Sequence, residues 1–232
     1  MKLHLGKSRK CLDNDQNVPS YKIALFGDEK VGKSSILRRL QKKSFSYEYE
    51  PTISEVYDIS FKSSDGLARI ITFFDTSGSI ECPPMARLTM TKCEANIVVY
   101  SVTSKKSLEV ANRKLNEISK TKGPGSVCLL VGNKCDVAAN AREVSFECGL
   151  KYAVNNKCAY LEVSALKNIN ILNAIDIVVK KLVDLNRTKK KVLSRSKSDY
   201  NKTNDKGLFT YRRRSVSLTQ LNITKQSEDF QL

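Results

Sequence analysis

The chain has 232 residues, of which 41% are hydrophobic and 28% charged, so it can form one domain of ordinary size with a sizeable core and additional tails. No stretch approaches the ~20 apolar residues that span a bilayer, and MKLHLGKSRK lacks the apolar region of a secretory signal, which argues against membrane-spanning and secreted classes. The formal net charge of +16 favours acidic partners.

Residues 1–20 are polar and without period, which predicts a flexible N-terminal arm. From Tyr21 onward, short apolar runs alternate with segments of helical spacing. Strands are predicted at 22–26, 55–61, 68–74, 95–101, 126–132 and 159–165, and helices at 33–42, 85–90, 107–120, 145–155 and 169–185. The turn formed by Ser64, Asp65 and Gly66 joins the second and third strands into a hairpin.

This order of elements predicts an α/β domain over residues 21–186. Strands that alternate with helices form βαβ units, in which the strands are parallel and the connecting helices cover the sheet. We therefore expect a mostly parallel six-stranded sheet with one antiparallel hairpin at its edge and helices on both faces.

The segment GDEKVGKS, residues 27–34, matches the phosphate-loop pattern G-x-x-x-x-G-K-[ST] between a predicted strand and a predicted helix. Backbone N–H groups of such a loop can surround the oxygens of a triphosphate, and the helix dipole adds to the attraction. Lys33 is expected to reach the outer phosphates, and the Ser34 hydroxyl to ligate Mg²⁺. The alternative is a chance glycine-rich turn, which the spacing and the context disfavour.

The segment NKCD, residues 133–136, directly follows a predicted strand. The carboxylate of Asp136 can accept hydrogen bonds from the N1–H and the 2-amino group of guanine, whereas adenine offers no matching donors. Four residues are a weak pattern alone. Downstream of a phosphate loop, at the edge of an open α/β sheet where ligands bind, the pattern favours a guanine site.

Five motifs in order, GDEKVGKS, the PT of YEPTIS, DTSG, NKCD and VSAL, occur between about Tyr21 and Leu185. In these motifs the chain resembles a small GTPase of the Ras superfamily, closest to the Ras-like branch. The resemblance implies a P-loop NTPase G domain with GTP or GDP and Mg²⁺ as ligands. It also implies GTP hydrolysis and a signalling cycle in which the loops around Thr52 and Ser79 are ordered by the γ-phosphate.

The resemblance also implies roles for single residues. Thr52 would ligate Mg²⁺ and contact the γ-phosphate, Asp75 would hold Mg²⁺ through water, and the Gly78 amide would sense the γ-phosphate. Independently, the Thr52 hydroxyl lies on a loop from which it can complete a magnesium shell. The expected metal ligands are Ser34, Thr52 and Asp75, and the expected catalytic residues are Lys33, Thr52 and Ser79.

At the base, the resemblance implies that Phe45 stacks on the guanine edge-on and that Lys134 covers the base face; core packing of Phe45 is the alternative. Ser164 and Ala165 would close the base pocket. The complete set of expected nucleotide-binding residues is Gly27, Asp28, Glu29, Lys30, Val31, Gly32, Lys33, Ser34, Ser35, Phe45, Thr52, Asp75, Gly78, Asn133, Lys134, Asp136, Ser164, Ala165 and Leu166.

Three positions depart from the Ras pattern. Ser79 stands where Ras-like enzymes usually carry a glutamine that orients the attacking water, and its side chain is too short for that task. Glu29 replaces a glycine and would crowd the space of a partner's arginine finger, which is worth ~10³–10⁵ in rate. Pro83 and Pro84 remove two N–H donors after the turn and restrict the shape of the second switch.

These departures predict slow intrinsic hydrolysis and resistance to Ras-type activating proteins. Two alternatives remain open. One is a constitutively GTP-bound adaptor that does not hydrolyse GTP, which turnover would separate from a slow switch. The other is a basic scaffold without nucleotide, which the intact phosphate, magnesium and guanine motifs disfavour.

We expect a monomer that binds effectors through Tyr49–Tyr57. From residues 187 to 232 the composition turns to Lys, Arg, Ser, Thr and Asn, which predicts a disordered tail. This segment has twelve Lys and Arg against four Asp and Glu, a net charge of +8. It suits an anionic membrane, calmodulin or, after phosphorylation, a phosphoserine reader. A specific nucleic-acid partner is not expected, because no nucleic-acid module is present.

The seven cysteines are odd in number and form no C-x-x-C pair, which fits a reducing, intracellular compartment. No cysteine follows Cys158, so we expect membrane attachment without prenylation. The predicted location is the cytoplasm, with the plasma membrane reached through the basic tail and the nucleus as a further alternative.

Overall fold

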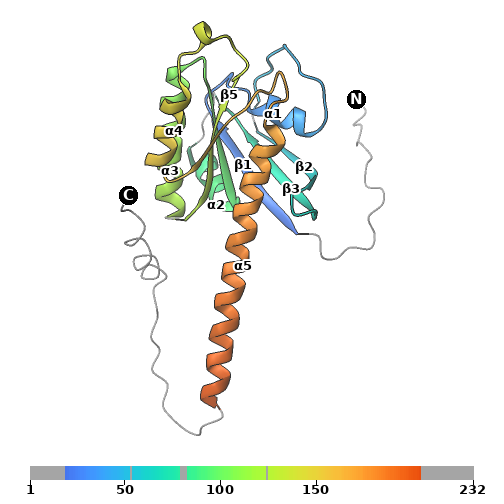
Figure 1. The fold of residues 1–232 in the computed structure, drawn as a ribbon, viewed down its shortest axis with the longest axis vertical. Coiled ribbons are helices and arrows are strands. Elements are labelled where there is room, and N and C mark those ends of the chain that lie inside the picture. Colours follow the sequence, from blue (N-terminus) through green and yellow to red (C-terminus); the bar gives the residue numbers. More distant parts are fainter. Residues whose placement is uncertain (1–18, 53, 79–82, 124, 205–232) are drawn as a thin grey trace, which may run out of the picture. The chain divides into compact units, whose positions relative to one another are not determined.

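A computed structural model describes residues 19–52, 54–78, 83–123 and 125–204 of the chain (Figure 1). The strands are β1 (Ser20–Gly27), β2 (Ser54–Lys62), β3 (Ala68–Thr76), β4 (Ala95–Ser101), β5 (Val127–Asn133) and β6 (Ala159–Glu162). The helices are α1 (Lys33–Leu40), α2 (Pro83–Lys92), α3 (Lys105–Lys122), α4 (Phe146–Asn155) and α5 (Ile171–Asn204), with a short 3₁₀ turn η1 (Ala139–Ala141) before α4.

The strands form one six-stranded sheet in the order β2-β3-β1-β4-β5-β6. Only the β2–β3 pair is antiparallel, and the other neighbouring pairs are parallel. The predicted fold class, a mostly parallel α/β sheet with one antiparallel edge hairpin, is confirmed. Because the strands of βαβ units run in the same direction, the loops that follow β1, β5 and β6 gather at one end of the sheet (Figure 1).

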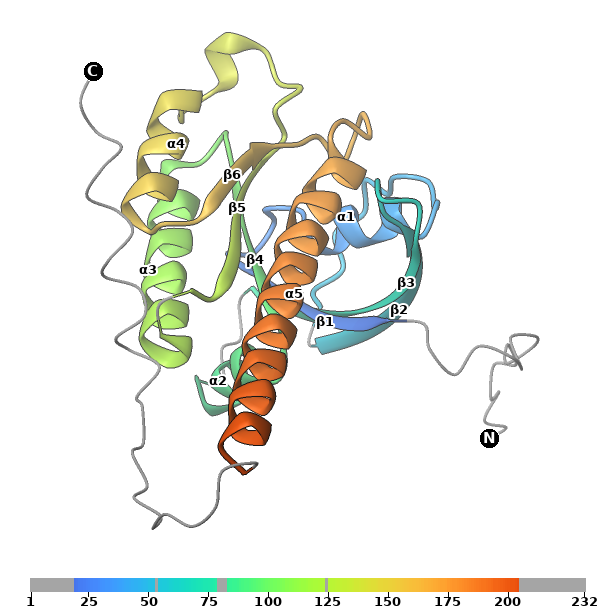
Figure 2. The same cartoon turned by 60° about the horizontal axis from the view of Figure 1, so that its bottom comes forward.

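Each face of the sheet is covered by its own hydrophobic core. Helix α1 and the first turns of α5 pack on one face, and α2, α3 and α4 pack on the other (Figure 2). Leu37 of α1 and Val178 of α5 belong to the first core, and Leu108 of α3 and Ala153 of α4 belong to the second. Burying a side chain of the size of Leu or Val contributes about 1.5–3 kcal/mol, so these two cores fix the sheet that carries the loops.

Two of the helices on the second face, α3 and α4, have a serine as N-cap residue. The Ser104 hydroxyl accepts a hydrogen bond from the backbone N–H of Ser107 at the start of α3, and the Ser145 hydroxyl accepts one from Cys148 at the start of α4. Helix α3 therefore begins at Lys105, two residues before the position that hydrophobic spacing predicted, because the cap and not the first apolar residue sets the boundary.

Two predicted elements differ from the structure. Pro83 and Pro84 lie in the first turn of α2 rather than in a break before it, since the N–H groups of a first turn need no partner inside the helix. Helix α5 continues to Asn204, so the predicted disorder from residue 187 is wrong for residues 187–204. Lysine and arginine are good helix formers, and this propensity persists after the apolar period has ended.

The chain divides into two compact units, the first of which ends at Arg187 and the second of which begins at Thr188. The predicted flexible arm falls, up to residue 18, outside the described residues, as do Ser79 and residues 205–232 of the tail. In the part that is described, no helix is both long and apolar enough to span a membrane.

Candidate guanine-nucleotide site

A pocket of about 670 Å³ opens at the carboxyl end of the sheet, in the first unit. Its walls come from the loop between β1 and α1, the segment that follows α1, the end of β3, the loop after β5 and the loop after β6. Residues from all five segments line it, among them Lys33, Phe45, Gly78, Asp136 and Ala165. Motifs that are far apart in the sequence therefore meet in one cavity of a size that suits a small-molecule ligand.

The loop between β1 and α1 is held by glycines at its two ends. Gly27 has φ 144°, and a Cβ there would lie 2.1 Å from the carbonyl oxygen of Val99 on β4. Gly32 has φ 95°, and a Cβ there would lie 2.2 Å from the Asn133 side-chain nitrogen. Both positions require glycine, because a side chain would meet a neighbouring strand as well as an unfavourable backbone angle.

Lys33 is buried at the floor of this loop, with 6% of its surface exposed. Its Nζ donates hydrogen bonds to the carbonyl oxygens of Gly27 at 3.0 Å and Asp28 at 2.8 Å. The cation thus lies inside the arc of the loop, where the phosphate-loop pattern predicted a group that attracts outer phosphates. Val31 is also buried, and its carbonyl oxygen accepts a hydrogen bond from Asn133, whereas Ser35 lines the pocket.

Two hydroxyl groups from separate segments meet beside the phosphate loop. The Oγ of Ser34, in the first turn of α1, lies 2.9 Å from the Oγ1 of Thr52, on the segment before β2. Asp75 lies nearby on β3, is fully buried, and has no hydrogen-bond partner for either carboxylate oxygen. Burial raises the pKa of this carboxyl, against the lowering effects of the Ser34 hydroxyl and the Lys33 cation.

This donor set fits a small divalent cation. Mg²⁺ prefers hydroxyl, carboxylate and water oxygens, and a buried carboxylate without a partner is costly unless a cation or a donor compensates it. The three predicted metal residues, Ser34, Thr52 and Asp75, are thus brought together, and the chemistry of their oxygens matches the ion that the sequence predicted.

The opposite end of the pocket is formed by the NKCD segment and the loop after β6. Oδ1 of Asp136 is buried and has no hydrogen-bond partner, as expected of a group placed for a ligand. Lys134 adopts φ 68°, and burial lowers its pKa while the Asp136 carboxylate partly offsets this effect. Phe45 faces this end as well and is half-buried; it both lines the pocket and packs on the first core, so its two alternative roles are not exclusive.

Asn133 connects the two ends of the pocket. Its Nδ2 donates to the carbonyl of Val31 at 2.7 Å, and its Oδ1 accepts from the backbone N–H of Ala165 at 3.1 Å. The side chain is buried, so both bonds are shielded from water. One amide therefore connects the phosphate loop, between β1 and α1, to the loop after β6, which we call the base loop. The motif alone did not predict this structural role.

The base loop has internal support of its own. Ser164 is fully buried, its Oγ accepts a hydrogen bond from the N–H of Lys167 at 2.9 Å, and its backbone pairs with Ile169. Ser164 does not line the pocket, whereas Ala165 and Leu166 do. Ser164 therefore shapes the loop from behind, and the backbone of the next two residues reaches the ligand space.

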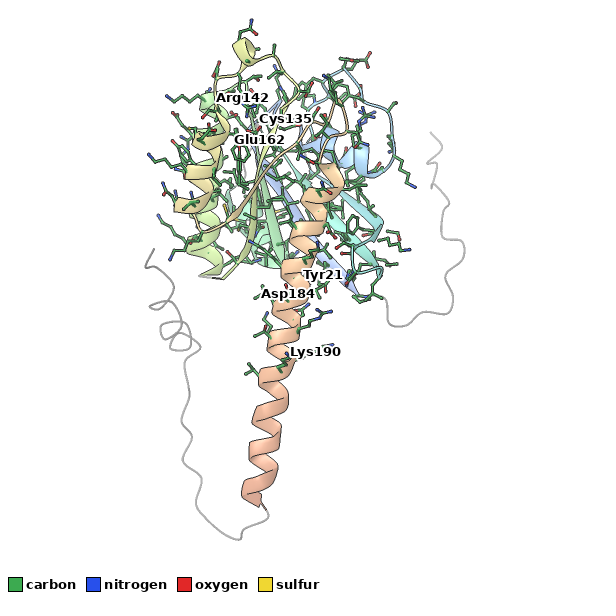
Figure 3. The ribbon with its side chains drawn as sticks, viewed as in Figure 1. Tyr21, Cys135, Arg142, Glu162, Asp184 and Lys190 are labelled. Carbon is green, nitrogen blue, oxygen red and sulfur yellow. The ribbon has the colours of Figure 1, made fainter. Side chains whose placement is uncertain are left out.

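A polar cluster supports the same loops from the side of α4. Arg142 forms an ion pair with Glu162 at the end of β6, and both side chains lie close to Cys135 of the NKCD segment (Figure 3). The Glu162 carboxylate also accepts a hydrogen bond from the Tyr160 hydroxyl at 2.8 Å, which in turn lies 2.8 Å from the Tyr100 hydroxyl. Burial raises the pKa of Tyr100 to about 12, and burial together with the hydrogen bond to Tyr100 also raises the pKa of Tyr160, so both phenols stay protonated and the network stays hydrogen-bonded.

Comparison with known proteins agrees with this geometry. Residues 22–184 match the model of the Ras family. The chain belongs to this family. Its relatives include the GTP-binding protein drn-1 of Caenorhabditis elegans, 36% identical over 160 residues that cover 68% of this chain and 73% of the relative. They also include the GTP-binding protein Di-Ras2 of Mus musculus, 39% identical over 153 residues that cover 65% of this chain and 76% of the relative.

A more distant relative is the Ras-like protein 1 of Saccharomyces cerevisiae, 32% identical over 172 residues, which are 74% of this chain and 55% of the relative. Ras-family proteins are GTPases that bind GTP and GDP, typically with Mg²⁺, and generally bind effector proteins. This chain is accordingly a Ras-like small GTPase that acts as a signalling switch.

In this Ras-family GTPase, the second half of DTSG lies against the phosphate loop. A Cβ at Gly78 would lie 2.5 Å from the backbone nitrogen of Glu29 and 2.6 Å from its Cα. Only glycine allows this close approach, which brings the Gly78 backbone against the phosphate loop. The Glu29 side chain is exposed at the pocket rim, and its N–H donates to the Asp28 carboxylate at 2.9 Å.

The segment predicted to bind effectors, Tyr49–Tyr57, contributes to one wall of the pocket and includes exposed side chains. Tyr49 is 49% exposed, and the Nζ of Lys30 on the phosphate loop lies 5.3 Å from the centroid of its ring. Val56 on β2 is also exposed. The exposed Lys30 ammonium thus lies within cation–π range of this segment.

One contributor to the site was missed by sequence reasoning. Arg39, in the last turn of α1, donates hydrogen bonds to the carbonyl oxygens of both Ala165 and Leu166. Its position outside the five motifs gave no signal, since basic residues are common in the last turn of a helix.

Proposed function

We propose that this Ras-family GTPase binds guanine nucleotide and Mg²⁺ in the pocket described above and hydrolyses GTP slowly. The observation that carries the proposal is the 2.9 Å pairing of the Ser34 and Thr52 hydroxyls beside Lys33, at one end of a cavity whose other end holds the unpartnered Asp136 oxygen. These groups are complementary to the phosphates, the metal and the guanine edge of a single nucleotide.

Each residue has a defined task in this proposal. Lys33 exchanges its bonds to the Gly27 and Asp28 carbonyls for phosphate oxygens. The hydroxyl oxygens of Ser34 and Thr52 would hold the metal directly, and the Asp75 carboxylate would hold it through water. When bound, Mg²⁺ supplies positive charge that neutralises the β- and γ-phosphate oxygens.

Hydrolysis requires that a water attack the γ-phosphorus while the bond to the β–γ bridging oxygen breaks, which releases GDP and phosphate. A residue that orients this water lowers the barrier, because catalysis of phosphoryl transfer is mostly positioning and electrostatic stabilisation. Ser79 is too short to act as the usual glutamine does, and the Glu29 side chain at the pocket rim would crowd the space that an arginine finger must enter.

The substitution Ser79→Gln is expected to raise the rate of single-turnover GTP hydrolysis at least about tenfold, because a longer amide can hold the attacking water. The measurement is phosphate release from GTP-loaded protein in excess Mg²⁺. A second variant, Glu29→Gly, is expected to raise the response to a Ras-type activating protein rather than the intrinsic rate.

Glu109→Gln, at an exposed position on α3 away from the pocket, serves as the control and should leave the rate unchanged. If wild type and Ser79→Gln both consumed GTP at the same rate, Ser79 would not be the cause of slow hydrolysis. GTP that stays intact in the wild type and in Ser79→Gln would instead support the alternative of a constitutively GTP-bound adaptor.

The basic second unit is proposed to bind anionic lipid. Lys189, Lys190 and Lys191 are exposed on α5, followed by Val192 with 53% of its surface exposed, and the Lys190 side chain projects from this part of the helix (Figure 3). Clustered cations beside an apolar group suit an anionic membrane surface at about 1 kcal/mol per basic residue. We propose that lipid binding brings the switch from the cytoplasm to the plasma membrane.

Changing Lys189, Lys190 and Lys191 to Gln is expected to weaken binding to vesicles that contain phosphatidylserine by about a hundredfold, because three lysines contribute about 3 kcal/mol together. Co-sedimentation with such vesicles measures the effect. The control removes the same charge from exposed lysines of α3, Lys105, Lys106 and Lys120. Equal binding to neutral vesicles, or binding to calmodulin alone, would contradict the lipid proposal.

A further inference from the structure

We propose that Arg39 is a positioning residue that holds the base end of the pocket closed and thereby sets the rate at which guanine nucleotide leaves. The inference rests on the proposed function, because it concerns the same pocket, and it adds a residue that lies outside the five motifs. In this proposal, the dissociation rate of the nucleotide depends on contacts between protein segments as well as on contacts to the nucleotide itself.

The guanidinium of Arg39 holds the base loop by two bonds. Its Nε donates to the carbonyl oxygen of Ala165 at 2.7 Å, and its Nη2 donates to that of Leu166 at 2.7 Å. The planar guanidinium presents these donors in a fixed fork, so two successive carbonyls can be held only when the loop has one shape. Hydrogen bonds from a charged donor are stronger than neutral ones, and the bond to Ala165 is partly shielded from water.

The same guanidinium also touches the segment on the other side of the base space. Its central carbon lies 5.8 Å from the centroid of the Phe45 ring, within the range of a cation–π interaction. A longer bond of 3.4 Å runs from Nη1 to the carbonyl of Lys43, two residues before Phe45. Arg39 therefore contacts both walls between which a guanine base would lie.

These contacts are distinct from an ordinary favourable charge at the end of a helix. A cation in the last turn of α1 stabilises that helix through its dipole and its free carbonyls. The partners of Nε and Nη2, however, lie 126 and 127 residues away in the sequence. Ala165 is in turn bonded to Asn133, which is bonded to Val31 of the phosphate loop. A displaced base loop would therefore also strain the connection to the phosphate loop.

A base can leave only when the Phe45 wall and the Ala165 wall move apart. Because Arg39 bonds to one wall and packs on the other, its loss should favour the open state and speed dissociation. The association rate should change much less than the dissociation rate, because changes within one binding site act mainly on dissociation. The expected signature is thus a faster dissociation rate at a nearly constant association rate.

The experiment follows the release of a fluorescent N-methylanthraniloyl GDP from loaded full-length protein after addition of excess GDP. Arg39→Gln is expected to release it at least about tenfold faster than wild type, because charge-assisted bonds to two carbonyls are lost. Arg39→Lys keeps the positive charge and the aliphatic chain but lacks the paired N–H donors of the guanidinium. It should therefore also release the nucleotide faster than wild type, by a smaller factor than Arg39→Gln. It also tests the proposal if Arg39→Gln folds poorly.

Lys42→Gln is the matched control, because Lys42 is an exposed cation just after the same helix whose side chain makes no hydrogen bond, ion pair or cation–π contact among the described residues. Its dissociation rate should stay within about twofold of wild type. Phe45→Leu supplies a double-mutant cycle with Arg39→Gln. Since the two side chains touch, the double variant should release nucleotide more slowly than the product of the single effects predicts.

Removal of Mg²⁺ by EDTA distinguishes the two ends of the pocket. The metal acts at the Ser34 and Thr52 end. The effects of its removal and of Arg39→Gln on the dissociation rate should therefore multiply, to within about twofold. An effect of Arg39→Gln that disappears in EDTA would place its action at the phosphates and overturn the proposal. A dissociation rate of Arg39→Gln equal to wild type would overturn the proposal alone, whereas wild-type protein that binds no guanine nucleotide would overturn the proposed function with it.

Discussion

The variant Asp136→Asn is expected to lose affinity for GDP by at least about a hundredfold and to gain affinity for xanthosine diphosphate. Guanine offers two donors, N1–H and the 2-amino group, which one carboxylate can accept together. Oδ1 of Asp136 is buried without a protein partner, so these bonds are not already made inside the protein. Asparagine replaces one acceptor by a donor, which opposes the 2-amino group of guanine and matches the 2-oxo group of xanthine.

Competition between labelled GDP and unlabelled GDP or xanthosine diphosphate measures this exchange of specificity. Asp58→Asn is a suitable control, because Asp58 is an exposed aspartate on β2 that accepts from the Thr72 hydroxyl, as an amide oxygen also can. It should leave both affinities unchanged. If Asp136→Asn weakened both nucleotides equally, Asp136 would be supporting the pocket rather than reading the base.

The variant Asp75→Asn is expected to have opposite effects on stability and on metal affinity. Without a ligand, the wild-type protein buries a carboxylate that has no hydrogen-bond partner. A neutral amide of the same size costs less to bury, so nucleotide-free Asp75→Asn should be more stable by about 1–3 kcal/mol. The same change removes negative charge from the metal site and should weaken Mg²⁺ binding in the GDP complex by about 10–100-fold.

Urea unfolding of the nucleotide-free protein measures the first effect, and Mg²⁺ titration of the GDP complex measures the second. Asp58→Asn again provides the comparison, and its free energy of unfolding should stay within about 0.5 kcal/mol of wild type. A destabilised Asp75→Asn protein would show that the carboxylate is compensated within the nucleotide-free fold, and unchanged Mg²⁺ affinity would remove Asp75 from the metal site.

The sequence was sufficient for the sheet, the phosphate loop and the guanine motif, because each is a local pattern with a local physical cause. Apolar runs define strands, and Gly27 and Gly32 mark backbone angles that other residues avoid. The five motifs also predicted which segments meet, since βαβ topology brings the ends of parallel strands to one edge. Element boundaries were less predictable where a cap sets them, as Ser104 does for α3.

Contacts between distant segments could not be predicted, because they depend on three-dimensional packing rather than on spacing. The double bridge made by Asn133 and the fork made by Arg39 join residues more than a hundred positions apart. Residues 187–204 were misassigned for a different reason. Their lysine and arginine residues favour a helix, although the apolar period that indicates a packed helix ends near residue 185.

The two carbonyl bonds of Lys33 have a consequence for the first encounter with a ligand. Before any phosphate arrives, Gly27 and Asp28 already hold the ammonium group in the centre of the loop, and Asn133 already holds the loop from behind. When a phosphate binds, Lys33 gives up its bonds to these carbonyl oxygens and bonds to the phosphate instead. The loop does not have to become ordered first, so little conformational entropy is lost on binding. Capture should therefore be fast and similar among variants, and residence time should carry most differences in affinity between them.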